Sequence, residues 1–341
     1  MKFKKIAALS TAVIMSASML VGCGNNKSKE NTDKSFKIGM VADIGGINDE
    51  SFNQSAWEGL QKAEKDFGIE VKVIESKQAS EYLQNMESLL DEDVDMVIGV
   101  GYTMKEDIEK QAKNYPDKQF VLIDETYDSI PENVTPILFR ENEAAYLTGL
   151  LAGKMTENNN VGFIGGIQTP VISRFEYGYK AGVKEANKDC NVNVQYAGTF
   201  SDAAKGKSIA NQMYGNGSDI ILAAAGGTGL GSIESAKEQN KYAIGVDRDQ
   251  SDLAPKNVLT SALKKVNVGV YDTVKEFVEG KLTGGQEKVY GLKEDGVGIP
   301  ETTKNLVQQD IIDYVNSMIE KIKNDEIKVP SNEEEYKSMQ K

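Results

Sequence analysis

The feature that most constrains the fold of this chain is an alternation of short apolar runs with longer amphipathic stretches. Runs such as M-V-I-G-V at residues 96–100 and Q-F-V-L-I at 119–123 are apolar almost throughout. Such runs suit strands that are buried on both faces, as in a parallel sheet covered by helices. The first series comprises predicted strands at residues 36–42, 69–74, 96–100, 119–123 and 135–139 and predicted helices at 53–67, 80–90 and 104–114. This series predicts one α/β lobe.

The same alternation starts again after a predicted helix at residues 141–155. I-G-M-V-A-D-I-G-G and V-G-F-I-G-G-I open the two halves alike. The second series comprises predicted strands at residues 161–166, 192–197, 220–225, 242–246 and 258–261 and predicted helices at 172–187, 203–214, 230–239 and 268–279. Two similar lobes with no long linker between them favour a bilobal binding protein over a single large doubly wound enzyme.

The expected domain ranges follow from this repeat. Residues 36–140 form the N-terminal lobe and residues 141–287 the C-terminal lobe, and a return segment near 288–341 joins the first lobe. Within the return segment, residues 288–297 read as a hairpin or a crossover, and residues 308–324 read as an amphipathic helix.

The amino terminus has the pattern of a secretory signal. Three lysines precede an apolar run at residues 6–21, which is too short for a membrane span, and L-V-G-C at residues 20–23 resembles a bacterial lipobox. Residues 1–22 are therefore expected to be a lipoprotein signal peptide, with Cys23 as the lipidated first residue of the mature chain. Residues 23–35 are polar and suit a flexible tether. The expected location is the extracytoplasmic face of the cell membrane.

Composition excludes several classes of function. The formal net charge of −13 makes nucleic acid an unfavourable partner. The chain has no histidine, which removes the commonest general base and metal ligand, and Cys190 is the single cysteine besides Cys23. This composition excludes a disulfide framework and a cysteine-based metal site. The chain is expected to be a binding protein with no metal, no cofactor and no enzymatic activity.

The loop that follows the first predicted strand is the strongest candidate for ligand contact. It reads D-I-G-G-I-N-D-E-S-F-N from residue 43 and leads into a predicted helix. In an α/β lobe such a loop lies at the carboxyl edge of the sheet, where open parallel sheets bind ligands. Its carboxylates and amides can bind hydroxyl groups and ring nitrogens, and its phenylalanine can stack on a flat ligand. The candidates in this loop are Asp43, Asn48, Asp49, Phe52 and Asn53.

Further candidates follow later predicted strands. Carboxyl ends of parallel strands lie on one edge of each sheet, so in two facing lobes these positions can converge on one crevice. Taken singly, each has a structural explanation, since an aspartate after a strand is often a helix cap and a glycine pair is often a turn. These candidates are Asp124, Phe200, Gly226, Gly227, Asp247 and Lys264.

The chain after Cys23 resembles the basic membrane protein family of bacterial lipoproteins, which are purine-nucleoside receptors of ABC-type importers. The resemblance rests on L-V-G-C at residues 20–23, D-I-G-G-I-N-D-E-S-F-N-Q-S-A-W-E-G at 43–59, G-T-F-S-D-A-A-K-G at 198–206, G-V-D-R-D-Q at 245–250 and T-S-A-L-K-K-V at 260–266. It implies a type I periplasmic-binding-protein fold, with adenosine, guanosine or inosine held between the lobes. It also implies an ABC permease and ATPase as partners.

The resemblance also implies a division of roles within the site. The base would lie between Phe52 and Phe200, with Asp43, Asn53 and Asp124 at its edge, and Gly227, Asp247 and Lys264 would hold the ribose. Lys264 is preferred to Lys265 because of its spacing from T-S at residues 260–261. The chemistry of these side chains agrees, since aromatic faces stack on purines and a carboxylate accepts hydrogen bonds from a diol.

Three alternatives remain open. The first is a dehydrogenase, because G-G-T-G-L-G-S at residues 226–232 is similar to a dinucleotide-binding loop. Two features disfavour it: serine stands where the third glycine of such a loop should be, and the motif opens the third unit of the second lobe. A nucleoside-processing enzyme would need a tight aspartate cluster near the first strand, which the sequence lacks. A sugar-binding or sensing lipoprotein of the same fold is the remaining alternative.

Overall fold

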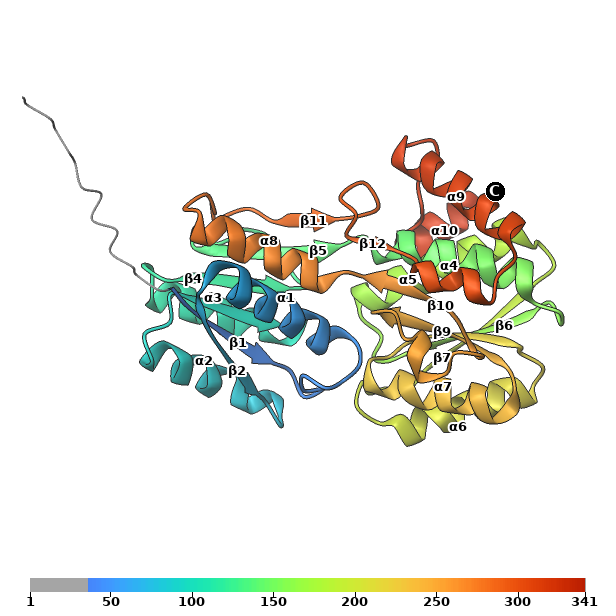
Figure 1. The fold of residues 1–341 in the computed structure, drawn as a ribbon, viewed down its shortest axis with the longest axis horizontal. Helices are drawn as coiled ribbons and strands as arrows, with labels where there is room; N and C mark the ends of the chain where they lie inside the picture. Colours follow the sequence, from blue (N-terminus) through green and yellow to red (C-terminus); the bar gives the residue numbers. More distant parts are fainter. Residues whose placement is uncertain (1–35, 341) are drawn as a thin grey trace, which may run out of the picture. The chain divides into compact units, whose positions relative to one another are not determined.

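Two six-stranded sheets form the centres of two lobes in the computed structural model, which describes residues 36–340 (Figure 1). The predicted signal peptide, Cys23 and the tether lie outside the described residues. The strand order is β11-β5-β4-β3-β1-β2 in the first sheet and β12-β10-β9-β8-β6-β7 in the second. Every pairing is parallel except that of β10 with β12. Since both sheets have the same order of equivalent strands, the recurrence predicted from the sequence is confirmed.

The bounds of the elements agree closely with the sequence pattern. Helix α4 spans the residues predicted for it, and most predicted strands agree to within two residues. The first sheet contains β1 (Lys37–Ala42), β2 (Glu70–Glu75), β3 (Met96–Val100), β4 (Gln119–Ile123), β5 (Val134–Phe139) and β11 (Lys288–Tyr290). The second sheet contains β6 (Asn160–Gly165), β7 (Asn191–Tyr196), β8 (Ile220–Ala224), β9 (Tyr242–Asp247), β10 (Val258–Lys264) and β12 (Val297–Gly298). The helices are α1 (Phe52–Phe67), α2 (Tyr82–Asp91), α3 (Lys105–Asn114), α4 (Glu141–Met155), α5 (Pro170–Ala186), α6 (Ala203–Gly215), α7 (Gly227–Gln239), α8 (Val266–Val278), α9 (Gln309–Lys323) and α10 (Glu333–Met339).

Helices cover both faces of each sheet, which explains why the central strands are apolar throughout. In the first lobe α2 and α3 pack on one face through Met86, Leu89 and Ile108, and α1 and α8 cover the other. In the second lobe α6 and α7 cover one face, and α4 and α5 cover the other. The central strands β3 and β8 are buried along their whole length as a result.

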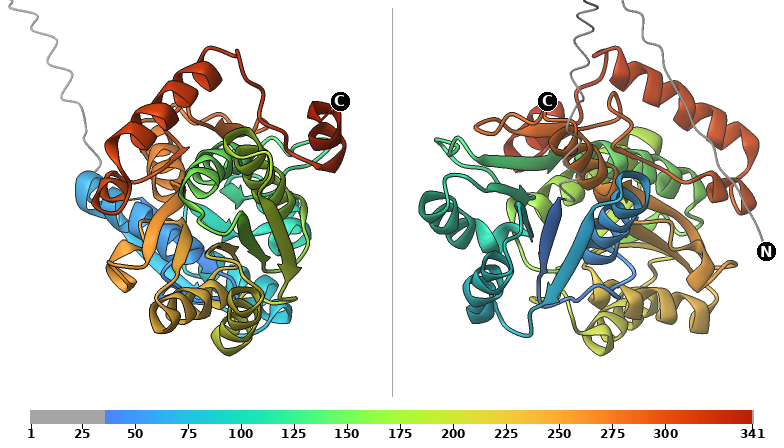
Figure 2. Two further views of the ribbon diagram at one scale, coloured as in Figure 1. Left: turned by 90° about the vertical axis from the view of Figure 1, so that its right-hand side faces the viewer. Right: turned by 60° about the vertical axis from the view of Figure 1, so that its left-hand side comes forward.

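The chain crosses between the lobes three times, and this changes the domain ranges expected from the sequence. The crossings join β5 to α4, β10 to α8, and β11 to β12. Helix α8 was assigned to the second lobe, but it packs on α1 in the first (Figure 2). The two helices touch so closely that a Cβ at Gly59 would lie 2.4 Å from the carbonyl oxygen of Asn267.

The tail after α8 is divided between the lobes instead of returning to the first. Strand β11 joins the first sheet and β12 joins the second, so residues 288–297 form a crossover and not a hairpin. Helix α9 packs on α4, and α10 packs on α5, where the rings of Tyr177 and Tyr336 are 5.8 Å apart. Helix α10 has no counterpart in the sequence-based prediction.

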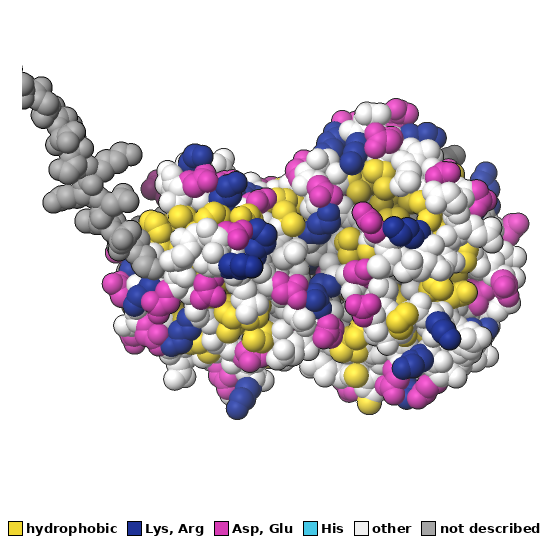
Figure 3. Space-filling model, viewed as in Figure 1, with side chains coloured by type: hydrophobic (Ala, Val, Ile, Leu, Met, Phe, Trp, Pro, Cys, Tyr) yellow, Lys and Arg dark blue, Asp and Glu magenta, His cyan; other side chains and the backbone are white. Residues whose placement is uncertain are grey.

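Acidic and basic side chains are interspersed over the face shown in Figure 3, including the waist between the lobes. A search of residues 36–340 for a helix with the length and apolar character of a membrane span finds none.

Candidate functional site

A pocket lies between the lobes, at the carboxyl ends of strands from both sheets. It contains about 690 Å³ of atom-free space, part of it open to solvent. All the residues predicted to contact a ligand line this pocket except Asn48, which is exposed on the surface of its loop. The residues brought together are Asp43, Asp49, Phe52, Asn53, Asp124, Phe200, Gly226, Gly227, Asp247 and Lys264.

The loop between β1 and α1 is held by its own side chains. The Asp49 carboxylate accepts hydrogen bonds from the backbone nitrogens of Ser51 (2.9 Å), Asn53 (2.9 Å) and Gln54 (3.1 Å), at the amino end of α1. The Asn53 side-chain nitrogen donates to Asp49 at 3.0 Å and to Asp43 at 2.8 Å. Both amide hydrogens of Asn53 are therefore used within the loop, so Asp49 and Asn53 set the shape of the pocket wall.

Asp43 keeps one oxygen outside this arrangement. Its Oδ1 accepts from the Gly45 nitrogen at 2.8 Å and from Asn53, whereas neither of these bonds uses Oδ2. Burial raises the pKa of Asp43, although the hydrogen bonds from Gly45 and Asn53 partly oppose this. A half-buried carboxylate whose Oδ2 is left free by these bonds is suited to accept an N–H or O–H from a ligand.

Asp124 and Lys264 form a buried ion pair across the cleft. Asp124 follows β4 in the first lobe, Lys264 ends β10 in the second, and their side chains are 7% and 3% exposed. Asp124 Oδ1 is buried and has no hydrogen-bond partner in the part of the chain that the structure describes. Because an unsatisfied buried acceptor is costly, this oxygen marks a position for a ligand donor.

The lysine in the pocket is Lys264 and not Lys265. Lys264 lies 4.4 Å from the centre of the Phe52 ring, whereas Lys265 bonds to Asp295 at the surface, at 2.7 Å. Burial would lower the pKa of Lys264, but the charges of nearby carboxylates, Asp124 first among them, raise it overall. Lys264 is therefore a permanently charged donor inside the site.

Asp247 ends β9 and accepts a hydrogen bond from the Ser51 hydroxyl of the opposite lobe. Burial raises the pKa of Asp247 to about 6, and Lys264 and Ser51 reduce the shift. Asp124 and Asp247 occupy equivalent strand ends in the two sheets and share a left-handed backbone, with φ of 70° and 64°. Aspartate tolerates this conformation better than most side chains.

Aromatic rings enter the pocket from both lobes. Phe52 is the first residue of α1, and Phe200 lies in the loop between β7 and α6. The Phe200 ring lies against Gly166, where a Cβ would be 2.2 Å from it, and the Phe200 carbonyl accepts from the Thr228 nitrogen at 3.0 Å. Phe175 on α5 also lines the pocket, although it was not predicted from the sequence. The sequence feature that could have indicated Phe175 is its place in the helix that follows β6, because Phe52 lies in the equivalent helix after β1.

Gly226 and Gly227 lie where β8 meets α7. Gly226 has a left-handed backbone, with φ of 54°, and α7 begins at Gly227, three residues earlier than predicted. The amino end of α7 thus belongs to the wall of the same pocket. Since its loop opens the third strand–helix unit of the second lobe, it does not have the position of a dinucleotide-binding loop.

The charges of the pocket wall disfavour an anionic ligand. Among residues 36–340, four aspartates line it, whereas Lys264 is its single basic side chain and is already paired with Asp124. A ligand rich in hydrogen-bond donors and with a flat face would complement acceptor oxygens and aromatic rings. A phosphate would meet no free cation.

Comparison with known proteins shows similarity to substrate-binding proteins of ABC transporters. Residues 36–333 match the profile of a family described as "ABC transporter substrate-binding protein PnrA-like". The ABC transporter nucleoside-binding protein BmpA of Lactococcus lactis is 38% identical over 91% of this chain and 97% of its own length. Basic membrane protein A of Borreliella burgdorferi is 39% identical, covering 89% of this chain and 91% of its own.

A solved structure agrees with the fold. The solute-binding protein of an ABC transporter system from Aeropyrum pernix superposes with a TM-score of 0.82 and 28% identity, covering 89% of this chain and 96% of that one. The predicted type I periplasmic-binding-protein fold is thereby confirmed.

Proposed function

The chain belongs to the family of PnrA-like ABC transporter substrate-binding proteins, and from this membership we propose that it captures purine nucleosides between its lobes and delivers them to an ABC importer. The proposal places it at the extracytoplasmic face of the cell membrane, anchored by a lipid on Cys23. A relative that is named a nucleoside-binding protein supports the ligand class.

The observation that carries the proposal is the pairing of Phe52 and Phe200, from opposite lobes, with buried carboxylates in one pocket. In our assignment the purine lies between the two rings, and Asp43 Oδ2 and Asp124 Oδ1 accept hydrogen bonds from its edge. Asp247, Lys264 and the amino end of α7 at Gly227 hold the ribose. Asn53 supports the base through Asp43, because its own amide hydrogens are committed to the loop.

The direct test is to identify what the protein binds. Mass spectrometry of material released on denaturation, followed by calorimetric titration with adenosine, guanosine, inosine and ribose, distinguishes a nucleoside receptor from a sugar receptor. Tight binding of ribose without binding of nucleosides would support the alternative that the chain is a sugar-binding protein. Release of hypoxanthine from inosine during incubation would indicate a nucleoside-processing enzyme.

Replacing Phe52 with alanine should weaken binding of every purine nucleoside, and of the free base, by about 1–3 kcal/mol, because one stacking surface is removed. Phe52→Leu is the matched control, since it keeps an apolar side chain but has no aromatic face. Titration calorimetry with inosine and hypoxanthine measures both losses. Unchanged affinity for hypoxanthine in the alanine variant would contradict the base assignment.

Replacing Cys23 with serine should release the protein from membranes, because serine cannot carry the thioether-linked lipid. Fractionation followed by immunoblotting is the measurement. The wild-type protein is expected in the membrane fraction after a high-salt wash, and the variant is expected in the soluble fraction. If the serine variant stays with the washed membranes, lipid attachment at Cys23 is wrong.

A further inference from the structure

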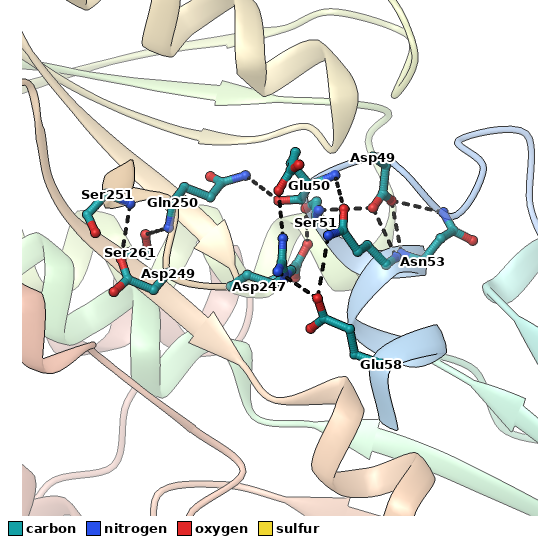
Figure 4. Close-up of polar contacts among 12 residues, drawn as sticks. Asp49, Glu50, Ser51, Asn53, Glu58, Asp247, Asp249, Gln250, Ser251 and Ser261 are labelled. Carbon is teal, nitrogen blue, oxygen red and sulfur yellow. Dashed lines mark hydrogen bonds and ion pairs between the residues drawn. The ribbon is translucent and has the colours of Figure 1, made fainter. Parts of the chain in front are cut away.

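Two loops meet across the mouth of the cleft and pair almost residue by residue. Residues 50–51, before α1, belong to the first lobe, and residues 247–250, which include the end of β9 and the loop after it, belong to the second (Figure 4). Ser51 donates to Asp247, and the Gln250 side-chain nitrogen donates to the Glu50 carbonyl at 2.8 Å. These contacts continue outward from the ligand pocket to the surface of the cleft.

Arg248 forms the outer part of this contact. Its two terminal nitrogens donate to different carboxylates of the first lobe, Glu50 and Glu58, each at 2.7 Å. Figure 4 labels the two glutamates. The three side chains are 24%, 44% and 39% exposed. A single exposed ion pair contributes little, but one guanidinium that bridges two carboxylates of the opposite lobe links the lobes at two points.

Each half of this contact is held by hydrogen bonds within its own lobe. The Glu50 nitrogen donates to the Gln54 side chain at 3.1 Å, and Asp49 holds the adjoining turn. On the other side, Gln250 accepts from the Val246 nitrogen at 3.1 Å, and its own backbone nitrogen donates to the Ser261 hydroxyl at 3.1 Å. Closing the lobes therefore orders few additional groups, which lowers the entropic cost of contact.

We propose that Arg248, Glu50 and Glu58 form an interlobe clasp that stabilises the closed protein and sets the rate of ligand release. Arg248 is a positioning residue here, because it does not line the pocket but directly follows Asp247, just as Glu50 and Ser51 directly precede Phe52. The clasp and the ligand contacts consequently move as one unit. This inference rests on the proposed function for its ligand, and on geometry for the clasp itself.

The chain supplies a matched control for the clasp. Lys207 also bridges two glutamates, Glu234 at 2.9 Å and Glu238 at 2.8 Å, and its side chain is 27% exposed. Its partners lie on α7 of its own lobe, so Lys207→Met removes a similar charge bridge without affecting contact between the lobes. Arg248→Met and Lys207→Met should therefore differ if the clasp acts on closure.

Stopped-flow release of inosine from the full-length protein is the first measurement. Arg248→Met should raise the dissociation rate by about 3- to 30-fold, as expected for two ion pairs of ordinary strength, and Lys207→Met should leave it unchanged. Wild-type release should quicken between 0.05 and 0.5 M salt, and this response should be smaller in Arg248→Met. Arg248→Lys should recover part of the loss, and Glu58→Gln should add little to Arg248→Met.

Small-angle scattering of the ligand-free proteins tests the clasp independently of the nucleoside. Arg248→Met should have a larger radius of gyration than wild type and Lys207→Met at low salt. Equal radii, or equal dissociation rates and salt responses for the two methionine variants, would overturn the clasp. If wild type binds no nucleoside, the proposed function fails, while the scattering comparison still decides whether the clasp holds the lobes together.

Discussion

Replacing Asp247 with asparagine is expected to stabilise the unliganded protein at pH 7 while weakening its binding of ribonucleosides. Burial raises the pKa of Asp247 from 3.8 to about 6, so between these values the folded protein binds more protons here than the unfolded chain does. The free energy of unfolding therefore falls as pH rises through that window. At pH 7 the buried charge of Asp247 costs the folded protein about 3 kcal/mol relative to the protonated carboxyl. Asparagine removes this cost, can still accept from Ser51 and tolerates the left-handed backbone.

Urea unfolding at pH 7 and pH 4 tests the stability half of this prediction. The variant should gain up to about 3 kcal/mol at pH 7, and most of this gain should disappear near pH 4, where the folded wild-type carboxyl is protonated and the unfolded one is about half protonated. Asp249→Asn is the matched control, because Asp249 is exposed and outside the pocket lining. An equal gain at both pH values would show that the buried charge is not its cause.

The binding half follows from the loss of charge and of acceptor capacity. Affinity for inosine should fall by about 1.5–3 kcal/mol, whereas affinity for hypoxanthine should hardly change. Discrimination against 2′-deoxyinosine should shrink, because the variant no longer leaves a buried carboxylate short of a donor. Equal losses of affinity for all three ligands would contradict the assignment of the ribose to Asp247.

Replacing Lys264 with methionine is expected to destabilise the protein by about 3–5 kcal/mol at pH 7, the usual result of breaking a buried ion pair from one side. Asp124 loses its ion-pair partner, and the nearby buried carboxylates Asp247 and Glu141 lose a compensating charge. The loss should be smaller at pH 5, because burial raises the pKa of Asp247 and of Glu141, and both accept protons more readily when Lys264 is gone.

Lys265→Met is the control for this change, because the neighbouring lysine pairs with Asp295 at the surface. It should cost less than about 1 kcal/mol. The double variant with Asp124→Asn and Lys264→Met should recover part of the loss, since it removes the carboxylate that was left unpaired. Equal destabilisation by Lys264→Met and Lys265→Met in urea unfolding would contradict the role of the buried pair.

The local sequence pattern predicted most of the helices and strands. It failed where the lobe to which a helix belongs depended on the surface that the helix packs against. The apolar runs of β3 and β4 and the bounds of α4 are local properties, so they could be read from the sequence. Helix α8 has an apolar face that does not by itself indicate which lobe it covers, and its contact with α1 depends on the absence of a side chain at Gly59. That close approach exists only once both helices are in place.

The site was predictable where residue type and position after a strand agreed. Asp124, Asp247 and Lys264 end or follow strands, and the structure places all three in the pocket. Asn48 has the same turn chemistry as its neighbours, but it is exposed because Asp49 and Asn53 turn the loop inward through their own hydrogen bonds. Phe175 was missed because a phenylalanine within an amphipathic helix is usually part of the core.

The three crossings between the lobes also bear on the order of synthesis. The edge strand β11 and the covering helix α8 of the first lobe come after five of the six strands of the second sheet in the chain. When the first 140 residues have emerged during translation, the apolar surface of α1 that later meets α8 is still uncovered, and one edge of the first sheet is unpaired. The lobe nearest the amino terminus can therefore be completed only after residue 290 has been made, so neither a nascent nor a truncated N-terminal half would be a finished folding unit.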